Sequence, residues 1–420
     1  MNRPFFVFLF ISLVSCHLHA QRCATQKTKK QSRIFEKWIN DKLAEPVLLF
    51  RKQSYTYRIP VVVHVIHQGE EPGTGTNISD AQIRSQIKVL NEDFNRLNAD
   101  TIYTPDIFKG VAANPEIEFV LAYQDPSGSD TIGITRTFGR AYSWNPADRE
   151  DRIKLKSIIM WPAEDYLNIW VTDLSGTYLG HAQFPKASTL PDFDDTVVPE
   201  QDGIIIDYRA FGSTGKNDSL DLMNNYDLGR TTTHEAGHFL GLLHIWGEGG
   251  CGSDDFCDDT PMQASESSSC PKPDSISCNT RDMYENFMDY THDECMNLFT
   301  KDQVARMHVV LGNSPRRKSL GTSHALTPKD GNDKIVGLED EVDDEILIYP
   351  NPVRNGRLII QARATDEYSV NFMDLNERIL ITSIGNNTIE MDLNGIASGI
   401  YLVKVTGKSI TKPSRIHVSD

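Results

Sequence analysis

The stretch from His234 to His244 has the pattern H-E-x-x-H-x-x-G-x-x-H, and it constrains the chain more than any other feature. On a helix, His234 and His238 face the same side at roughly 6 Å from each other, a spacing at which two imidazoles hold one zinc ion. Gly241 can adopt a positive φ and end that helix sharply, so that the turned chain brings in His244 as a third ligand. Three protein ligands leave a fourth position open to water, as in catalytic zinc sites.

Glu235 follows the first of these ligands directly. Its carboxylate is placed to polarise a water at the metal without binding the metal itself, which makes Glu235 the expected general base of a hydrolytic site. The alternative is a helix that carries three histidines by chance, and the number of residue types that the motif specifies argues against it.

The composition bounds the class of protein. The chain has 420 residues, which is too long for one average domain, and its 39% hydrophobic content is enough for a core. The net charge of −16 argues against a nucleic-acid partner, because binding to phosphates needs a basic surface. An acidic chain also suits a secreted protein that binds cations.

The N-terminus predicts export. Residues 1–20 combine a short positive start, an apolar run from Phe5 to Val14 that is too short to span a membrane, and a cleavage point after Ala20, as in a signal peptide. The alternative is a lipoprotein signal with the lipid on Cys16. Residues 21–54 are then a pro-segment, in which the thiolate of Cys23 is expected to occupy the open zinc position of a zymogen. The alternative for Cys23 is an unpaired cysteine in a leader peptide.

Residues 55–313 alternate between strand and helix patterns up to the zinc motif, which predicts an α/β (α+β) domain with the metal on a helix. The segment 178–185 lies between two expected strands, and Pro185 indicates that it ends an edge strand. Such a strand can pair with an extended substrate, which makes Gly180, His181 and Ala182 candidate substrate-binding residues. The expected strands cover residues 58–67, 117–122, 166–171 and 203–207, and the expected helices cover 79–94 and 151–161.

The segment after the zinc motif is rich in Gly, Ser, Asp, Pro and Cys, and it would be unstable without cross-links or ions. Clustered cysteines in an exported protein predict disulfides, although the residues alone leave the connectivity open. Clustered carboxylates repel one another unless a cation lies among them, and we expect one or two calcium ions there. The alternative is a solvated acidic loop. The candidate calcium ligands are Asp254, Asp255, Asp258, Asp259 and Thr260.

These residues resemble the metzincin clan of zinc endopeptidases, and within it the pappalysin family, over roughly residues 58–312. The resemblance implies a twisted mixed sheet and a Met-turn at residues 286–290. It places Met288 beneath the zinc as a hydrophobic floor and Tyr290 near the metal, where its hydroxyl can hydrogen-bond the tetrahedral intermediate. It also implies the disulfides Cys251–Cys278 and Cys270–Cys295, which leaves Cys257 over.

Asp293 carries the expectation about specificity. In one branch of the family an acidic residue at this position forms the floor of the S1′ pocket, where a carboxylate binds a guanidinium bidentately. The resemblance therefore implies cleavage on the N-terminal side of Arg, with Lys weaker, and it makes the Phe50–Arg51 bond a candidate activation site. The alternative for Asp293 is a surface aspartate in a loop.

Residues 314–342 have the composition of a linker, and residues 343–420 predict a small all-β sandwich of short strands. The motifs at 349–352 and 398–405 resemble the C-terminal sorting domain of the type IX secretion system of Bacteroidetes. This resemblance implies the type IX machinery as a partner and export through the periplasm of a Gram-negative bacterium to the medium or the cell surface.

Together these features predict a monomeric secreted zinc endopeptidase, made as a zymogen, that acts on proteins or peptides. One alternative is a non-catalytic cell-surface binding protein, an adhesin, stabilised by zinc and calcium. Another is a zinc hydrolase that acts on bonds other than peptide bonds.

Overall fold

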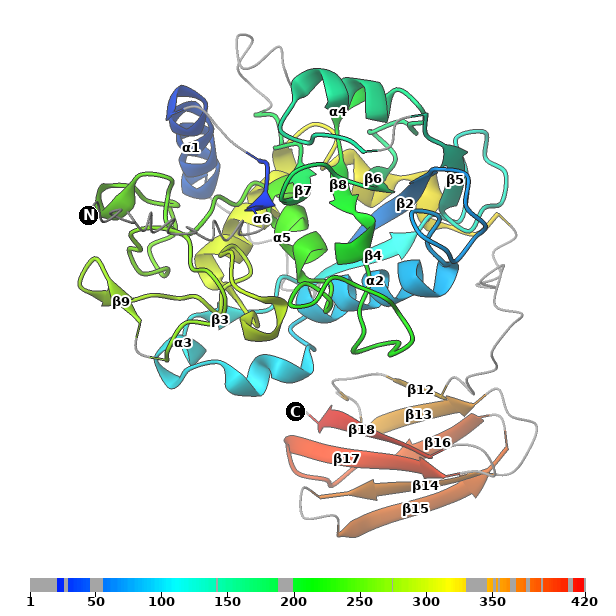
Figure 1. The fold of residues 1–420 in the computed structure, drawn as a ribbon. Helices are drawn as coiled ribbons and strands as arrows, with labels where there is room; N and C mark the ends of the chain where they lie inside the picture. Colours follow the sequence, from blue (N-terminus) through cyan, green and yellow to red (C-terminus); the bar gives the residue numbers. More distant parts are fainter. Residues whose placement is uncertain are drawn as a thin grey trace, which may run out of the picture. The chain divides into compact units, whose positions relative to one another are not determined.

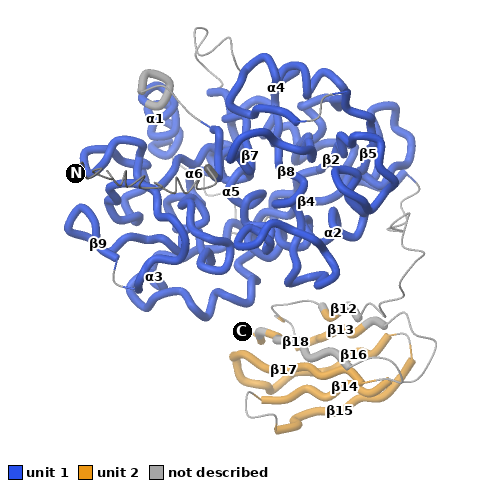
Figure 2. Tube along the Cα trace, viewed as in Figure 1, with its two compact units in different colours: residues 1–335 blue, residues 336–420 orange. Residues whose placement is uncertain are grey.

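The chain divides into two compact units, residues 1–335 and residues 336–420, each with its own hydrophobic core (Figure 2). The expected signal peptide over residues 1–20, including Cys16, and the Phe50–Arg51 bond lie outside the described residues. The computed structural model describes residues 21–25, 29–45, 56–140, 143–187, 199–273, 275–329, 346–349, 353, 356–362, 368–374, 378–386, 388–406 and 411–418.

A seven-stranded mixed sheet organises the first unit, in the order β1-β7-β8-β6-β2-β4, with β5 also paired to β2. β7 is antiparallel to β8, and β1 runs parallel to β7 at the edge of the sheet, while the other pairs are parallel. The central strands β2, β6 and β8 are buried on both faces, which explains their nearly continuous apolar runs. The bounds are β1 Gln21–Cys23, β2 Tyr57–His67, β4 Ile117–Leu121, β5 Ile134–Phe138, β6 Leu167–Thr172, β7 Tyr178–Ala182 and β8 Ile204–Asp207.

Helices cover both faces of this sheet (Figure 1). α2 (Asp80–Asp93) and α5 (Arg230–Phe239) pack together on one face, and α4 (Arg149–Lys156) lies on the other. Ser79 caps the start of α2, because its hydroxyl accepts a hydrogen bond from the backbone of Gln82 at 3.1 Å. α6 (Lys301–Asn313) begins at a capping box formed by Thr300 and Gln303.

The first unit also contains α1 (Lys29–Ala44) and several short elements. The short elements are α3 (Asp106–Lys109), β3 (Ala112–Ala113), β9 (Ile276–Ser277), β10 (Thr280–Arg281) and β11 (Phe299–Thr300), with 3-10 turns at Ala99–Tyr103, Pro199–Gln201, Tyr208–Ala210, Gly250–Gly252 and Asp293–Cys295.

Two boundary predictions were wrong. The helix expected to reach Trp161 ends at Lys156, because the following segment bonds to β6 instead: the backbone of Trp161 exchanges hydrogen bonds with the Asn168 side chain at 2.8 and 3.0 Å. The linker expected from Ser314 does not begin there. Residues 314–327 form two 3-10 turns (Ser319–Thr322 and His324–Leu326) whose Leu320 and Ala325 are fully buried in the first unit. Their apolar residues are too sparse to form a visible periodicity.

The second unit is a β-sandwich of a three-stranded and a four-stranded antiparallel sheet. Its last strand was not predicted, because it contains Pro413, and proline is disfavoured in strands. This strand lies at the edge of its sheet, where a missing backbone N–H is tolerated. The bounds are β12 Ile346–Tyr349, β13 Arg357–Ala362, β14 Tyr368–Met373, β15 Ile379–Gly385, β16 Thr388–Asp392, β17 Gly399–Thr406 and β18 Thr411–Val418.

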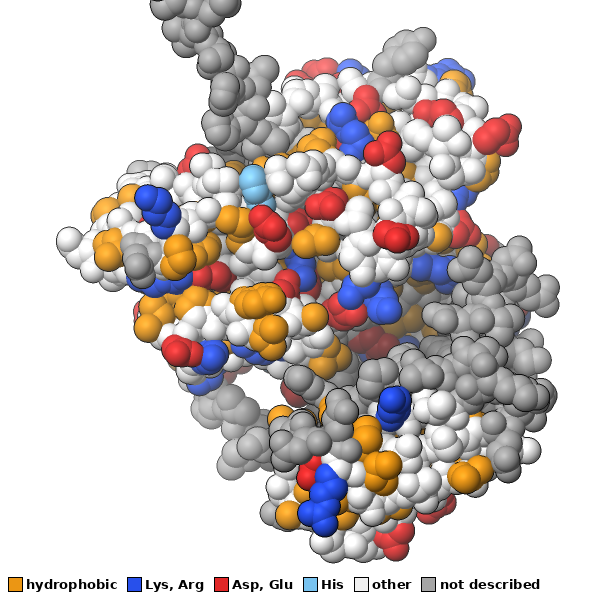
Figure 3. Space-filling model, turned by 60° about the horizontal axis from the view of Figure 1, so that its bottom comes forward, with side chains coloured by type: hydrophobic (Ala, Val, Ile, Leu, Met, Phe, Trp, Pro, Cys, Tyr) orange, Lys and Arg blue, Asp and Glu red, His pale blue; other side chains and the backbone are white. Residues whose placement is uncertain are grey.

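The surface is mixed in character. On the face drawn in Figure 3, acidic and basic side chains are interspersed with polar and apolar ones and are not sorted into a basic region. Among the described residues, the helices are too short or too polar to cross a bilayer.

Candidate active site

Three histidine side chains converge at the end of α5. The Nε2 atoms of His234, His238 and His244 lie 3.0–3.2 Å from one another, and all three side chains are buried. Each Nδ1 faces an acceptor: the Phe287 carbonyl for His234, the Leu242 carbonyl for His238, both at 2.8 Å, and the Glu248 carboxylate for His244. These acceptors favour the tautomer with its proton on Nδ1, so three lone pairs point at one spot. Such an arrangement needs a cation and fits zinc.

The turn at Gly241 brings the third histidine into place, as expected. Gly241 has a φ of +92°, and a Cβ there would lie 2.8 Å from the Val310 side chain. α5 ends at Phe239, and the backbone of Leu242 reaches back to the Gly237 carbonyl at 3.0 Å, so His244 lies beside the two helical histidines.

A buried network holds α5 in position. The Asp93 carboxylate of α2 accepts hydrogen bonds from Arg230 at 2.5 Å and from the Thr233 hydroxyl at 2.6 Å. Burial raises the pKa of Asp93 to about 7, against the opposing effects of Arg230 and Thr233. These residues join α2 to the first turn of the zinc-motif helix.

Cys23 lies among the three histidines. Its Sγ and the histidine nitrogens form a group of four candidate ligands whose atoms all lie within 4.8 Å of one another, and Cys23 is buried. β1 places it there by parallel pairing with β7, which puts Cys23 opposite Gly180. The next residues continue the contact, because Ala24 donates to the Gly180 carbonyl at 2.9 Å and Ala182 donates to the Thr25 hydroxyl at 2.9 Å.

Glu235 is fully buried beside this group. Burial raises the pKa of its carboxyl to about 8, although hydrogen bonds from Cys23 and Thr25 act in the opposite direction. The Thr25 hydroxyl donates to Glu235 at 3.2 Å. Gly180 on β7 leaves room for this side chain, because a Cβ there would lie 2.7 Å from Glu235. The need for glycine at position 180 was not foreseen from the sequence.

His181, the neighbour of Gly180 on β7, directs its side chain to the opposite face of the sheet. Side chains alternate along a strand, so His181 points away from Glu235. Burial lowers the pKa of His181 well below its usual range, with further effects from Lys156 and Arg152 of α4 on the other face of the sheet. His181 therefore offers the site its backbone and not its ring.

The Met-turn lies beneath the histidines. Met288 is fully buried, and a Cβ at Gly237 of α5 would lie 2.4 Å from its sulfur. The Tyr290 ring lies 5.6 Å from His234 and 4.9 Å from His244, measured between ring centroids. Its hydroxyl donates to the Cys23 carbonyl at 3.2 Å, so the Tyr290 hydroxyl faces the metal-ligand group.

Asp293 is fully buried and is not a surface residue. Its Oδ2 accepts hydrogen bonds from the backbones of Leu228 and Arg230, each at 3.0 Å, at the start of α5. Its Oδ1 accepts from the Arg22 guanidinium at 2.6 Å, and Arg22 is also fully buried. The Arg22 guanidinium lies 5.5 Å from the centre of the Tyr226 ring. Sequence reasoning missed Arg22, and the available signal was a basic residue directly before Cys23.

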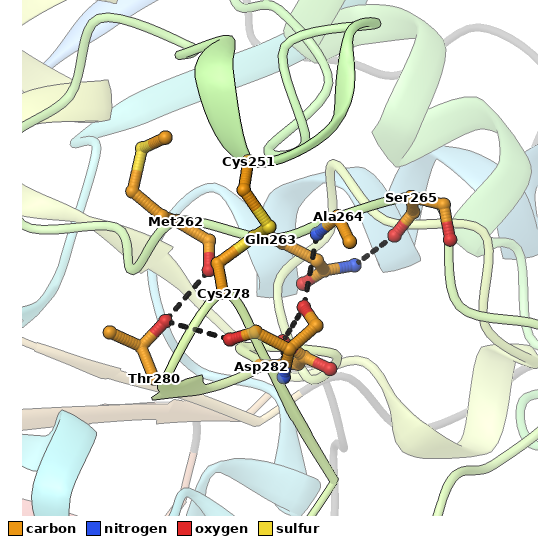
Figure 4. Close-up of a disulfide and its surroundings, with 9 residues drawn as sticks. Cys251, Met262, Gln263, Ala264, Ser265, Cys278, Thr280 and Asp282 are labelled. Atoms are coloured by element: carbon orange, nitrogen blue, oxygen red, sulfur yellow. Dashed lines mark hydrogen bonds between the residues drawn. A yellow bond between two sulfur atoms is a disulfide. The ribbon is translucent and has the colours of Figure 1, made fainter.

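The loop after the zinc motif is cross-linked. The structure pairs Cys251 with Cys278 and Cys270 with Cys295, as the resemblance implied, and Cys257 is free and buried. Figure 4 shows hydrogen bonds around the first disulfide, where the Thr280 hydroxyl donates to the Met262 carbonyl at 2.7 Å. The disulfides stabilise this segment, because it has too few apolar residues to be held in place by a hydrophobic core.

The acidic residues of this loop are only partly brought together. Asp255 is buried, its Oδ1 accepts from the Thr260 hydroxyl at 2.7 Å, and its Oδ2 has no protein partner among the described residues. Burial raises the pKa of Asp255 to about 8. Within the part of the chain that the structure describes, Oδ1 of Asp259 is also buried without a partner, whereas Asp254 and Asp258 are exposed. The four carboxylates do not converge as the histidines do among the described residues.

Two protein-family models match parts of the chain. A family model described as pregnancy-associated plasma protein-A matches residues 151–312, and a model described as a secretion system C-terminal sorting domain matches residues 347–419. An extracellular metalloprotease of Arthroderma benhamiae is 38% identical over 264 residues, which are 60% of this chain and 73% of the relative.

Solved structures also match. Mature mirolysin of Tannerella forsythia in complex with a cleaved peptide is 42% identical, with a TM-score of 0.56, over 64% of this chain and 96% of that one. A mutant of Tannerella forsythia promirolysin is 37% identical, with a TM-score of 0.60, over 72% of this chain and 97% of that one.

Proposed function

Because the chain belongs to the pappalysin family and is a metalloprotease that is secreted or carried on the cell surface, we propose that it is a zinc endopeptidase made as a zymogen that cuts on the N-terminal side of arginine. Its substrates are proteins or peptides. We propose Arg as the preferred residue after the cut, with Lys weaker.

The contact between Arg22 and Asp293 carries the specificity proposal. The fully buried Asp293 carboxylate accepts two backbone N–H bonds on one oxygen, and a guanidinium donates a directed hydrogen bond to the other. A neutral side chain in the same place would leave the charge unpaired, which costs more than the contact itself contributes. Lysine supplies one compact charge and no planar fork, so it binds less well.

The catalytic residues follow from the geometry around the histidines. His234, His238 and His244 would hold zinc, which supplies Lewis-acid polarisation of the scissile carbonyl and lowers the pKa of a water. Glu235 takes a proton from the attacking water and passes it to the leaving amine. Tyr290 donates its hydroxyl hydrogen bond to the developing oxyanion. The backbone of Gly180, His181 and Ala182 holds the substrate extended along β7.

The position of β1 explains how the enzyme would be kept inactive. Cys23 takes a place among the zinc ligands, Thr25 bonds to Glu235, and the backbone of residues 21–25 pairs with β7. We therefore propose that residues 21–54 are a pro-segment that blocks the metal, the base and the substrate strand together. A promirolysin structure matches more of this chain than a mature mirolysin structure does, 72% against 64%, which supports this proposal.

We also propose one or two structural calcium ions in the loop at 254–260. The support is the buried Asp255, which has an oxygen without a protein partner and a pKa raised by burial, because a cation removes the cost of keeping that carboxylate charged. Asp254, Asp258, Asp259 and Thr260 are the other candidate ligands.

The remaining proposals concern processing and export. We propose a signal peptide over residues 1–20, a catalytic domain that begins at residue 55 and includes the buried turns at 314–327, and a sorting domain over 343–420. The C-terminal match supports a type IX secretion route, and we propose that the chain passes through the periplasm of a Gram-negative bacterium. We propose that the processed enzyme is a monomer.

An active-site titration tests the catalytic proposal. Wild type and the Glu235→Ala variant are titrated with a hydroxamate inhibitor, zinc content is measured in both, and peptide cleavage is followed. We expect zinc in both proteins and cleavage only in wild type. Glu164→Ala, at an exposed glutamate, is the matched control and retains full activity. A non-catalytic adhesin would show no hydroxamate-sensitive cleavage in any of the three.

A further inference from the structure

The helix α1 has a second attachment to the catalytic unit that does not involve Cys23. Phe35, Trp38 and Ile39 on α1 are at most 3% exposed and pack against Phe184 and Val310. The Phe35 and Phe184 rings meet edge to face with their centroids 5.1 Å apart. Buried aromatic anchors of this kind carry most of the affinity in protein interfaces.

A buried ion pair fixes the register of α1 on this surface. Glu36 accepts two hydrogen bonds from the Arg306 guanidinium of α6, at 2.5 and 2.7 Å, with side chains only 5% and 2% exposed. A bidentate pair that is this well buried sets the position of one helix on another. The ion pair therefore joins the two helices α1 and α6, which pack against each other (Figure 1).

The same surface includes the turn of the zinc motif. A Cβ at Gly241 would lie 3.2 Å from the Phe35 ring, and the Gly241 carbonyl accepts from Arg306 at 3.4 Å. We define the α1-docking surface as Phe184, Gly241, Arg306 and Val310. It lies behind the turn that carries His244, whereas β1 lies at the histidines themselves.

We propose that the α1-docking surface retains the segment 21–50 as a non-covalent inhibitor after the Phe50–Arg51 bond is cut. This proposal rests on the proposed function. Hydrolysis at that bond consumes one water and leaves a carboxylate on Phe50 and an amine on Arg51. Because β1 and α1 both precede the bond, the cut removes none of their contacts.

Helical structure also protects the retained segment from a second cut. Proteases bind substrates as extended strands. Arg33 lies within α1, so it presents no extended bond while α1 stays docked. Arg22 is extended on β1, but it is held against Asp293 on a strand that runs parallel to β7. Full activation therefore requires dissociation of α1.

The test separates binding from proteolysis. Residues 46–50 of the full chain are replaced by the recognition sequence of an external site-specific protease, which makes the cut whether or not the chain itself is active. Size-exclusion chromatography with mass spectrometry then shows whether the released segment elutes with the enzyme. We expect co-elution in wild type and in Lys37→Ala, whose side chain is 74% exposed. We expect loss of the segment in Glu36→Ala. Immediate loss in wild type, or equal behaviour of the two variants, overturns the proposal.

A second measurement does not depend on folding of a variant enzyme. Synthetic peptides of residues 21–50 are added to the processed enzyme, and inhibition of peptide cleavage is measured. We expect Glu36→Ala to weaken inhibition about thirtyfold or more, the effect of truncating one partner of a buried charge pair, and Lys37→Ala to leave it unchanged. A Cys23→Ser peptide should still bind and inhibit. If Cys23→Ser abolishes binding and Glu36→Ala does not weaken it, the cysteine alone holds the segment and the proposal is wrong. An enzyme without cleavage activity would refute the proposed function, while the chromatographic test would still decide the docking.

Discussion

The Arg22 guanidinium donates to the Asp293 carboxylate at 2.6 Å, with both side chains fully buried and a sequence separation of 271. The pair joins the proposed pro-segment to the residue that the sequence resemblance had singled out for specificity. Arg22 thus occupies, in the proposed zymogen, the place that we assign to the arginine of a substrate.

Replacing the Asp293 carboxylate should remove the preference for arginine. In Asp293→Asn we expect kcat/KM for a peptide with Arg after the cut to fall about 100-fold, because truncating a buried charge pair costs about 2–5 kcal/mol. The change should be much smaller for a peptide with Ala at that position. Asp221→Asn, at an exposed aspartate, is the control and should match wild type. An unchanged Arg-to-Ala ratio in Asp293→Asn would remove this residue from the specificity site.

Removing the Cys23 thiol should weaken latency. The Cys23→Ser zymogen lacks a good zinc ligand at this position but keeps the α1 contacts, so we expect measurable peptide cleavage before any processing and faster self-processing than in wild type. The assay combines initial rates with N-terminal sequencing over time. Cys257→Ser, at a second cysteine that is free and buried among the described residues, should remain as latent as wild type. Equal latency of both serine variants would argue against the zinc plug.

Calcium should stabilise the loop at 254–260. We expect a calcium-selective chelator to lower the Tm of the wild-type zymogen by several degrees, since a ligand at 100 times its Kd contributes about 2.7 kcal/mol. Asp255→Asn should have a low Tm that no longer responds to calcium. Asp106→Asn, at an exposed aspartate, should respond like wild type. A calcium response that survives in Asp255→Asn would place the ion elsewhere.

His64 should make the catalytic unit sensitive to mild acid. Burial lowers the pKa of His64 to about 4 from its ordinary 6.5. The unfolded chain therefore binds more protons between these values, and stability falls as the pH drops from 6.5 toward 4. Between pH 7 and pH 5 this loss is about 2 kcal/mol.

Urea unfolding of His64→Gln at the two pH values measures that contribution. The variant should be less stable than wild type at pH 7, because its side chain replaces a ring bonded to Thr135 and Asn168, but it should lose less stability on going to pH 5. His324→Gln, at an exposed histidine, should keep the wild-type pH dependence. Parallel behaviour of His64→Gln and wild type would show that another group dominates.

The sequence predicted the elements whose signals are local. The helix of the zinc motif, the helix at 79–94 and the strand at 58–67 depend on neighbours a few residues away, and the structure has a helix or a strand at each of these places. The cysteine pairing and the role proposed for Asp293 came from resemblance to a family. For the cysteines, several connectivities fitted the residues equally well.

The features that could not be predicted from the sequence depend on contacts between distant segments. Arg22 gains its partner 271 residues away, and Glu36 finds Arg306 at a distance of 270 residues. The stretch after Ser314 has linker composition, but Arg317 bonds to Asp202 at 2.9 Å and folds it onto the catalytic unit. Composition and periodicity carry no information about such long-range pairs.

Zinc-dependent cleavage before arginine can be tested on many substrates at once. The most direct measurement incubates the processed protein with a peptide library, with and without a zinc chelator, and maps every cleavage site by mass spectrometry. We expect nearly all cuts to fall on the N-terminal side of Arg, with a minority before Lys, and we expect the chelator to abolish them. Cuts with no basic residue after them, or cleavage that persists in the chelator and in Glu235→Ala, would contradict this expectation.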